Sequence, residues 1–560
     1  MPAHDLLAER PLLLTIMAQL HAFTGQLPED RTQLYTEAVQ FLNNDWNKAG
    51  VFIDYIRERA GLLIRHKTEA YTFPHRTFQE FLAACHLASL PDYASEAARL
   101  VRAEPDRWRE VFLLAAGYSA RINLLGQALN AVNALCPFEP DAPRSAAPAD
   151  WPAAPLAGMA LLEIGLVGVQ REPVGQAVQQ RVQRWLQIGM RHDALTPRER
   201  AEAGAVLARL GDPRDEVLFS AAMEFCYVPA GPFWMGSQDD PDAQNIEQPQ
   251  EKLEIFYGYW IGRYPVTNAQ FGEFAAAGGY REARYWGEAR AAGYWNSDGY
   301  KGWRDYERRQ TPSNFGEPRN LPNHPVVEVS WYEGLAYTRW LQEWLTGQIP
   351  AGWRVRLPNE PEWEKAARGG VEMPAQKLLR LVTEGLTDER APTMHPNLQE
   401  RQRYPWGNEP DANRANYDES GIGATSAVGC FAGGASVYGV EELSGNVWEW
   451  TRSLYGEYPY PMSGAERDKR ENLAAGSSDL RIIRGGAYYV NRTHVRCARR
   501  YRYYPDYWDN NWRFSGGGVP MMTLASDSPC AGWLPLESPG KPRSPSTAPA
   551  PYPAGLRKVG

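Results

Sequence analysis

The chain has 560 residues, with 43% hydrophobic and 22% charged residues and a formal net charge of −8. This length allows several domains, each with its own core. The acidic balance disfavours a general binder of nucleic acids or of anionic membranes. The N-terminus lacks the pattern of a signal peptide, and no apolar run is long enough to span a bilayer. We therefore expect a cytoplasmic protein that does not contact a membrane.

The cysteines are scattered and include no Cys-x-x-Cys pair: they are Cys85, Cys136, Cys226, Cys430, Cys497 and Cys530. This spacing predicts neither a zinc site nor a disulfide framework. The chain also has 20 Trp and 29 Tyr residues, most of them after residue 225. That shift in composition predicts two parts with different architectures.

The first part, residues 1–135, is predicted to be helical because apolar residues recur at helical spacing. This spacing occurs in Leu12, Met17 and Leu20, in Leu34, Phe41 and Leu42, and in Phe78, Phe81, Leu82 and Cys85. The Pro/Ala-rich residues 136–155 predict a linker. Residues 156–222 return to Ala-rich helical spacing, which is typical of solenoid-like repeats.

Three phrases in residues 5–120 resemble the helical region that follows the nucleotide-binding core in NACHT-type STAND ATPases. They are LAERPLLLTIMAQLHAFTGQLPEDRTQLY, YTFPHRTFQEFLAACHLA and WREVFLLAAG. No GxxxxGK[ST] sequence occurs, so the chain lacks a phosphate-binding loop and we expect it to bind no nucleotide on its own. The resemblance implies the trailing part of a STAND architecture, completed by an ATPase module or a missing N-terminal segment.

From residue 223 the sequence changes to short strands, turns and aromatic residues. Three segments each predict a strand followed by a helix, and the expected N-caps are Thr267 or Asn268, Ser330, and Asn359. Glu362 follows the last cap at capping-box spacing, and Gly369 is expected to end that helix. We place this domain at residues 223–520. The Pro/Ser/Ala-rich residues 521–560 predict a disordered tail.

Seven phrases of this domain resemble the formylglycine-generating enzyme (sulfatase-modifying factor) family. They are VPAGPFWMGS, YPVTNAQF, HPVVEVSWYEGLAYTRWL, RLPNEPEWEKAARGG, YPWGN, SGNVWEWT and RIIRGGAYYVNRTHVRCARRYRYYPDYWDNNWRF. The resemblance implies an α+β fold of the C-type lectin-like class. The expected fold class is therefore multidomain, an all-α N-terminal region followed by this domain. Fold alone does not fix function.

The enzymes of this family carry two cysteines in the last phrase, which bind copper and drive oxidation of a substrate cysteine. The corresponding positions here are Val490 and Val495. Valine can neither bind a metal nor exchange disulfides, whereas a linear Cu(I) site needs soft sulfur ligands. We therefore expect no copper and no catalysis by the family's mechanism. Cys497, two residues further on, is expected to be a buried structural thiol.

The resemblance also implies a calcium site around the phrase that ends in Trp-Glu-Trp. Mapped position by position, its ligands are the side chains of Glu442 and Glu449 and the carbonyls of Gly445 and Val447. Carboxylate and carbonyl oxygens suit a hard cation such as calcium. The alternative is that Glu449 only caps or pairs locally.

A second family calcium site would use the side chain of Asn416 and the carbonyls of Tyr417 and Ile422. The family has an acidic residue at the next ligand position, where this chain has Ser420. The substitution removes one negative charge, which lowers the expected affinity of this site for calcium.

Aromatic residues are unusually dense between residues 488 and 512, a segment that covers the former active site in the family fold. Tyr and Trp interleaved with Arg are typical of binding hot spots. The run YRYYPDYWDNNW shows neither strand alternation nor helical spacing, which favours a surface loop over a core segment. The predicted ligand-binding residues are Tyr488, Tyr489, Asn491, Thr493, Arg500, Tyr501, Tyr503, Tyr504, Tyr507, Trp508, Asp509, Asn510, Asn511 and Trp512. Pro505 restricts Tyr504 and favours an inward side chain there; Trp448 and Trp450 are expected in the core.

We therefore predict a non-catalytic ligand-binding module attached to a STAND-type signalling region, with a protein or cell-surface ligand as its partner. The aromatic segment is also similar to the variable region of proteins diversified by retroelements, which use this fold. Two alternatives remain open: a copper-dependent formylglycine-generating oxidase or another enzyme of that family, and a structural domain without a ligand. A basic and aromatic mixture can also stack on single-stranded nucleic acid, which the acidic balance disfavours.

Overall fold

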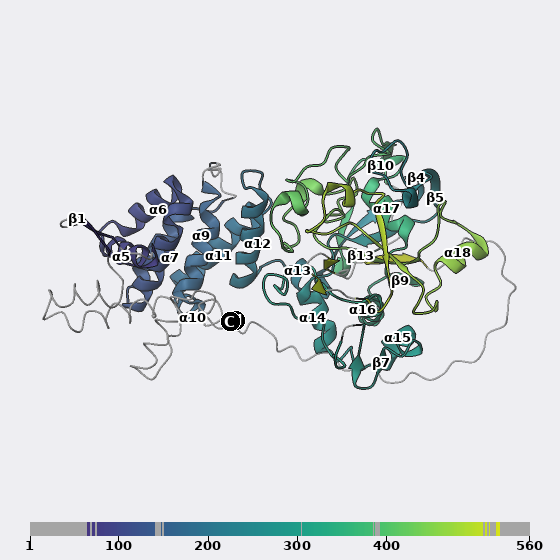
Figure 1. The fold of residues 1–560 in the computed structure, drawn as a ribbon, viewed down its shortest axis with the longest axis horizontal. Helices are drawn as coiled ribbons and strands as arrows, with labels where there is room; N and C mark the ends of the chain where they lie inside the picture. Colours follow the sequence, from purple (N-terminus) through teal and green to yellow (C-terminus); the bar gives the residue numbers. More distant parts are fainter. Residues whose placement is uncertain are drawn as a thin grey trace. The chain divides into compact units, whose positions relative to one another are not determined.

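The structure, a computed structural model, describes residues 64–67, 70–72, 76–140, 147, 150–303, 305–384, 386, 392–507, 510–511, 514–515 and 522–526. The chain forms two compact units, Met1–Leu186 and Gln187–Gly560 (Figure 1). The helices expected between Leu12 and Leu42 lie outside the described residues. Within the described part of the chain, no helix is both long and apolar enough to cross a bilayer.

The first unit is an array of helices. They are α5 (Arg76–Ser89), α6 (Tyr93–Ala103), α7 (Pro105–Arg121), α8 (Leu125–Leu135), α9 (Ala153–Ile164), α10 (Leu166–Arg171) and α11 (Pro173–Gly189), which crosses the boundary between the units. Helix α7 packs against α5, α6, α8 and α9. All its residues from Val111 to Gly117 are buried, as expected of a helix that is apolar all round. The helical prediction is confirmed for residues 76–135.

A short antiparallel hairpin precedes α5. It is formed by β1 (Ile64–Lys67) and β2 (Ala70–Thr72), with Ile64 opposite Thr72. The all-helical prediction for residues 1–135 is therefore wrong for this segment. Strands of four and three residues are too short to show a clear two-residue alternation, so hydrophobic spacing does not reveal them.

The Pro/Ala-rich segment 136–155 is anchored in the core of the first unit near both of its ends. Trp151 is buried, and its ring centroid lies 4.9 Å from that of Trp185. The Trp185 Nε1 donates a hydrogen bond to the Phe138 carbonyl at 2.7 Å. Because α9 already begins at Ala153, the predicted linker extends too far toward the C-terminus.

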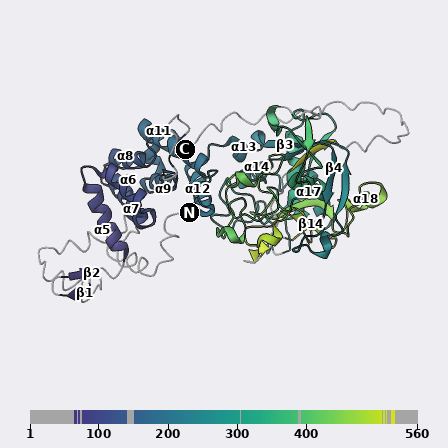
Figure 2. The same cartoon turned by 90° about the horizontal axis from the view of Figure 1, so that it is seen from above.

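The second unit opens with α12 (Pro197–Leu210) and α13 (Asp215–Leu218) and continues as an α+β domain (Figure 2). Helix α12 packs tightly on the loops of this domain, because a Cβ atom at Gly204 would lie 2.6 Å from the Ala427 Cβ. The Arg200 Nη2 also donates to the Asn413 carbonyl at 2.7 Å. The expected boundary after residue 222 therefore differs from the observed division, which places α12 with the C-terminal domain.

Two sheets carry the domain. The larger has the order β11 (Leu379–Leu381), β3 (Glu224–Val228), β6 (Tyr259–Gly262), β18 (Thr523–Ser526), β9 (Trp353–Arg356), with antiparallel neighbours. The smaller consists of β13 (Glu449–Leu454), β14 (Arg481–Arg484) and β15 (Arg500–Tyr503). Four antiparallel pairs complete the strands: β4 (Gly231–Met235) with β5 (Glu251–Ile255), β7 (Trp295–Asn296) with β8 (Gly299–Tyr300), β10 (Glu372–Pro374) with β12 (Met394–Pro396), and β16 (Asn510–Asn511) with β17 (Phe514–Ser515).

The domain's helices are α14 (Asn268–Ala276), α15 (Gly287–Ala291), α16 (Trp331–Trp344), α17 (Glu360–Arg368) and α18 (Gly464–Arg470). The predicted caps of α14, α16 and α17 are confirmed as Thr267, Ser330 and Asn359, each in a reciprocal capping box with the residue three positions on. Gly369 ends α17 with φ 92°, a backbone conformation that glycine adopts at low cost.

Strand β18 contradicts the expected tail at residues 521–560. Thr523 is buried and lies opposite Ile261 of β6 on one side and Arg356 of β9 on the other. A strand of four residues that pairs only with strands far away in the sequence leaves little signal of its own in the sequence. The surrounding Pro and Ser residues dominate the composition of the segment, which therefore predicts a disordered tail. The folded domain therefore extends to Ser526 at least.

The core of the domain is rich in aromatic residues whose polar atoms are paired. Trp448 and Trp450 are buried, as expected. The Trp450 Nε1 donates to the Val329 carbonyl, and the Trp331 Nε1 donates to the Thr451 carbonyl, both at 3.0 Å. These bonds join α16 and the segment before it to β13, so the smaller sheet is fixed relative to the helix.

Candidate functional site

The two positions that carry catalytic cysteines in the family are apolar here. Val495 is fully buried in a cluster with Tyr404 and Tyr417, and the half-buried Val490 packs against the same cluster. Neither side chain offers an atom that can hold a metal, and Val495 packs closely against the backbone of Gly486, where an added Cβ would lie 2.7 Å from the Val495 Cγ1. These residues do not fit copper.

Cys497 occupies the core, as expected for a structural thiol. Its side chain is fully buried, and burial raises the pKa of the thiol to about 12. Its backbone N–H donates to the Arg403 carbonyl at 2.7 Å. A thiol that is neither exposed nor ionised near neutral pH is a poor nucleophile and a poor metal ligand, so it does not replace the missing pair.

The four predicted ligands of the first calcium site lie in one tight loop and the strand after it. Glu442, Gly445 and Asn446 have φ values of 67°, 78° and 60°, so the backbone curls back on itself. Glu442 is buried and accepts from the Gly429 N–H at 3.0 Å and from the Asn446 Nδ2 at 3.2 Å. Glu449 is fully buried and accepts from the Trp363 Nε1 at 2.8 Å.

Burial raises the pKa of Glu442 to about 7, with a smaller contribution from the neighbouring Glu441 charge. Among the described residues, no cationic side chain is in ion-pair contact with Glu442. A divalent cation would offset the cost of burying this carboxylate. The set of two carboxylates with the Gly445 and Val447 carbonyls fits calcium chemically.

The second predicted calcium position has a different chemistry. The Ser420 hydroxyl donates to the Tyr417 carbonyl at 2.7 Å and to the Asn416 Oδ1 at 3.3 Å. Two of the three predicted ligand oxygens, the Asn416 Oδ1 and the Tyr417 carbonyl, thus already accept a hydrogen bond from Ser420. The third is the neutral carbonyl of Ile422. These residues do not fit calcium as well as the Glu442 and Glu449 pair does.

The run that begins at Tyr501 starts within a regular strand, β15, contrary to the absence of alternation expected from the sequence. On β15, Arg500 and Arg502 point to one side, since both guanidinium groups lie over the Tyr455 ring, at 5.4 and 3.9 Å. Tyr501 and Tyr503 point to the other side, with ring centroids 5.2 Å apart. The Arg and Tyr residues of β15 therefore lie on opposite faces of the strand.

The tyrosines continue into a stack of rings. Tyr503 lies parallel to Tyr507 at 4.4 Å, and Tyr507 stacks on Trp303 at 5.1 Å. At the other end, Tyr501 lies 6.1 Å from the buried Trp448. The outer rings reach the solvent: Tyr501 is 37% exposed, Tyr504 49% and Trp303 53%. We refer to Trp303, Tyr501, Tyr503, Tyr504 and Tyr507 as the aromatic surface.

Backbone hydrogen bonds hold the loop that carries this surface. The Pro505 carbonyl accepts from the N–H of Trp331 at the start of α16, at 3.1 Å. The Asp506 carbonyl accepts from the Trp303 N–H at 3.3 Å, and the Tyr507 N–H donates to the Tyr504 carbonyl at 3.0 Å. These bonds fix the backbone that carries the rings, and a contact surface fixed in this way would lose less entropy on binding.

Two predicted ligand-binding residues lie in the interior instead. Arg500 is fully buried and pairs with Glu360, because it faces the core side of β15. Tyr488 is 7% exposed, and its hydroxyl accepts from the Arg319 Nη2 at 3.3 Å. Conversely, Tyr504 lies outward, so the expectation that Pro505 holds it inward is wrong.

The remaining predicted residues fall into two groups. Tyr489 is half-buried against Tyr488, and Asn491 caps the turn Arg492–His494 by accepting from the Thr493 N–H at 3.1 Å. Trp508, Asp509 and Trp512 lie outside the described residues, and of Asn510 and Asn511 the structure describes only the strand pairing of β16. Trp303 is not among the predicted residues, because nothing in the sequence of its own aromatic-rich loop shows that this loop packs against residues 501–507.

Residues 215–514 match the Sulfatase-modifying factor enzyme 1-like domain family. The chain belongs to this family. Residues 50–87 match a second family, the winged helix-turn-helix domain C-terminal to NACHT, a range that includes the β1–β2 hairpin and most of α5. The helical region followed by a mixed helix and sheet domain confirms the predicted fold class.

Curated relatives include enzymes and an inactive protein. Hercynine oxygenase of Mycolicibacterium thermoresistibile is 33% identical over 275 residues, which cover 46% of this chain and 50% of that protein. The inactive C-alpha-formylglycine-generating enzyme 2 of Bos taurus is 30% identical over 325 residues, covering 53% and 89%. The formylglycine-generating enzyme of Mus musculus is 28% identical, covering 50% and 70%. The chain thus spans about half the length of the hercynine oxygenase.

Two solved structures are also similar. Treponema denticola variable protein 1 is 17% identical with a TM-score of 0.34, covering 54% of this chain and 95% of that chain. PvdO from Pseudomonas aeruginosa is 21% identical with a TM-score of 0.30, covering 54% and 93%.

Proposed function

We propose that the C-terminal domain is a non-catalytic ligand-binding module and that the aromatic surface is its contact surface. The observation that carries this proposal is the ring stack from Tyr501 through Tyr503 and Tyr507 to Trp303, exposed at its outer rings and fixed by backbone hydrogen bonds. Rigid, partly exposed Tyr and Trp rings offer large contact area at low entropy cost.

The packing of Val490 and Val495 supports a role without oxidation chemistry. These two valines belong to a hydrophobic cluster and stand at the positions where the family's enzymes have copper-binding cysteines. Curated relatives include the inactive protein of Bos taurus, so loss of activity has a precedent in the family. Other relatives are hercynine oxygenases and formylglycine-generating enzymes.

The helical region supports a further part of the proposal. We assign it to a STAND-type sensor that operates in the cytoplasm and reports ligand binding to an ATPase module, in this chain's own N-terminal extension or in a partner. The match to a domain that follows NACHT modules supports this assignment. The ligand is a protein surface, since partly exposed Tyr and Trp rings are typical of the contact residues of protein interfaces.

The test selects peptides from a phage-displayed random library on the full chain and measures their affinity for variants. The test variant combines Trp303→Ala, Tyr501→Ala and Tyr504→Ala. The matched control combines Phe219→Ala, Phe256→Ala and Leu398→Ala, which are exposed apolar residues outside the aromatic surface.

We expect most selected peptides to lose affinity for the test variant by at least about 2 kcal/mol, as for hot-spot truncations. The control should keep its affinity, and both variants should keep the thermal midpoint of the wild type. Peptides that bind the two variants equally well would refute the proposal. A large drop in midpoint of the test variant alone would show that the rings belong to the core.

A further inference from the structure

A pocket of about 210 Å³ lies beside the loop that follows β4. It is lined by loop residues 237–241 with Gln250, by Arg401, Arg403 and Asn408, by Arg496 with Ala498, and by Arg368 of α17. None of these residues belongs to the aromatic surface or to the calcium positions. The pocket is therefore separate from both.

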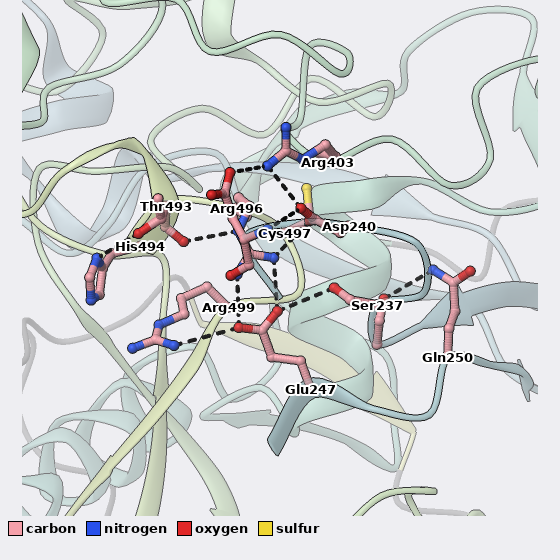
Figure 3. A network of polar contacts seen from close by, with 12 residues as sticks. Ser237, Asp240, Glu247, Gln250, Arg403, Thr493, His494, Arg496, Cys497 and Arg499 are labelled. Atoms are coloured by element: carbon pink, nitrogen blue, oxygen red, sulfur yellow. Dashed lines mark hydrogen bonds and ion pairs between the residues drawn. The ribbon is translucent and has the colours of Figure 1, made fainter. Parts of the chain in front are cut away.

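The interior wall of the pocket is rigid and its charges are matched. Figure 3 shows Arg496 between Asp240 and Glu247: its Nη1 donates to the Asp240 Oδ2 at 2.9 Å and to the Glu247 Oε2 at 2.8 Å. Asp240 also pairs with the Arg403 Nη2 at 2.9 Å. The buried Arg496 thus has a carboxylate partner on each of two sides. The charges of this wall are therefore paired without a ligand.

The outer wall carries two charges of opposite sign that have no ionic partner. The Arg401 Cζ lies 3.6 Å from the centroid of the Trp234 ring, and among the described residues no carboxylate is in ion-pair contact with the Arg401 guanidinium. Asp239 has φ 57° and likewise contacts no cation within the described part of the chain. A third open group is the Arg403 Nε, which is buried and has no acceptor among the described residues.

These open groups define the chemistry of a ligand. The planar guanidinium fork of Arg401 matches a carboxylate, with the Arg403 Nε as an additional donor. Asp239 matches an ammonium group. Because one water occupies about 30 Å³ of liquid, the pocket holds a molecule of roughly seven water volumes. We propose that this pocket binds a small zwitterion of the size of an α-amino acid, with its carboxylate on Arg401 and its ammonium group on Asp239.

The test uses the full chain and each of the standard L-α-amino acids as probe, with binding measured by isothermal titration calorimetry. Each amino acid that binds is compared with its N-acetyl derivative, which lacks the ammonium group, and with its carboxamide, which lacks the carboxylate. The variants are Arg401→Gln and Asp239→Asn, which remove one charge each. Asparagine tolerates the left-handed conformation at position 239, so this variant should fold. Arg414→Gln is the control, since Arg414 pairs with Asp411 outside the pocket.

We expect at least one amino acid to bind the wild type and the control equally. Each charge-removing variant, and each derivative, should weaken this binding by about tenfold or more. The proposal is overturned if no amino acid binds at 10 mM (about the weakest affinity of interest). It is also overturned if the N-acetyl derivative or inorganic phosphate binds as tightly as the amino acid, or if both variants bind like the wild type. None of these outcomes depends on the aromatic surface, so this test and that of the proposed function fail separately.

Discussion

Arg500 and Glu360 form an ion pair in which both side chains are fully buried, with the Arg500 Nη2 2.8 Å from the Glu360 Oε2. It joins β15 to the first residue of α17. The next strand residue, Tyr501, faces the solvent instead. One strand therefore carries a structural residue and a candidate binding residue side by side.

Removing Arg500 should destabilise the domain strongly, because the buried Glu360 then keeps only Arg484 at 3.3 Å and Arg470 at 3.8 Å as cationic partners. We expect Arg500→Leu to lower the free energy of unfolding by about 3–5 kcal/mol, measured by urea denaturation. The matched control is Arg502→Leu on the same face of β15, where the half-buried guanidinium lies over Tyr455 and forms no ion pair with any residue that the structure describes; it should cost much less. Equal losses in the two variants would contradict the structural role of the pair.

Lys365 of α17 is buried and donates to the carbonyls of Pro229 and Gly231, at 2.5 and 2.9 Å. Burial lowers the pKa of its amine to about 7. The charge of Glu254 and the two carbonyl contacts favour the charged form, but the loss of hydration outweighs them. Between the folded pKa and the unfolded pKa of about 10.4, the unfolded chain binds more protons than the folded chain. Stability should therefore rise with pH across this window.

Lys365→Met should remove this rise, so that its stability depends less on pH between about 7 and 10 than that of the wild type. The exposed Lys377→Met serves as the control and should keep the wild-type slope. The measurement is urea denaturation at several pH values in that window. Parallel curves for all three proteins would show that Lys365 titrates normally.

Calcium at the Glu442 and Glu449 position should stabilise the folded domain alone. A free concentration of one hundred times Kd would add about 2.7 kcal/mol, so a chelator should lower the thermal midpoint of the wild type. Glu449→Gln should have a lower midpoint that no longer responds to the chelator. Ser420→Ala, at the second position, should respond like the wild type. A wild-type melting curve that is identical with and without chelator would argue for local pairing of Glu449 only.

A formylglycine-generating oxidase would oxidise the cysteine of a Cys-x-Pro-x-Arg peptide, whereas a non-catalytic binding module would leave this peptide unchanged. We expect the wild type, with or without added copper, to leave the mass of this peptide unchanged. The variant with Val490→Cys and Val495→Cys should also be inactive, because burial beside Tyr404 and Tyr417 keeps a thiol protonated. Mass spectrometry that detects loss of the cysteine sulfur with the wild type would establish an oxidase.

Local features of the fold could be read from the sequence. The caps Thr267, Ser330 and Asn359 are set by residues within three positions of each other, and the valine positions follow from a contiguous motif. The direction of Arg500 could not be read in this way, because its partner Glu360 lies 140 residues away. The composition of a segment shows that Arg and Tyr are present, but only the pairing of the strand decides which of them faces the core.

The aromatic surface was predictable in its centre and not at its margin. Tyr501, Tyr503 and Tyr507 belong to the dense segment, and the structure brings them together. Trp303 joins them from a loop about 200 residues earlier, through its stacking on Tyr507 and the Trp303 N–H bond to Asp506. A contact between distant loops leaves no pattern in either sequence segment.

Strand β18 also has a consequence for biosynthesis. The larger sheet places Thr523–Ser526 between β6, which ends at Gly262, and β9, which ends at Arg356. During translation, β6 and β9 therefore emerge long before the strand that pairs with both, and each waits with an unpaired edge that can capture another chain. The nascent domain should depend on chaperones, and ribosome-stalled chains that end before residue 523 should resist proteolysis much less than chains that include Ser526.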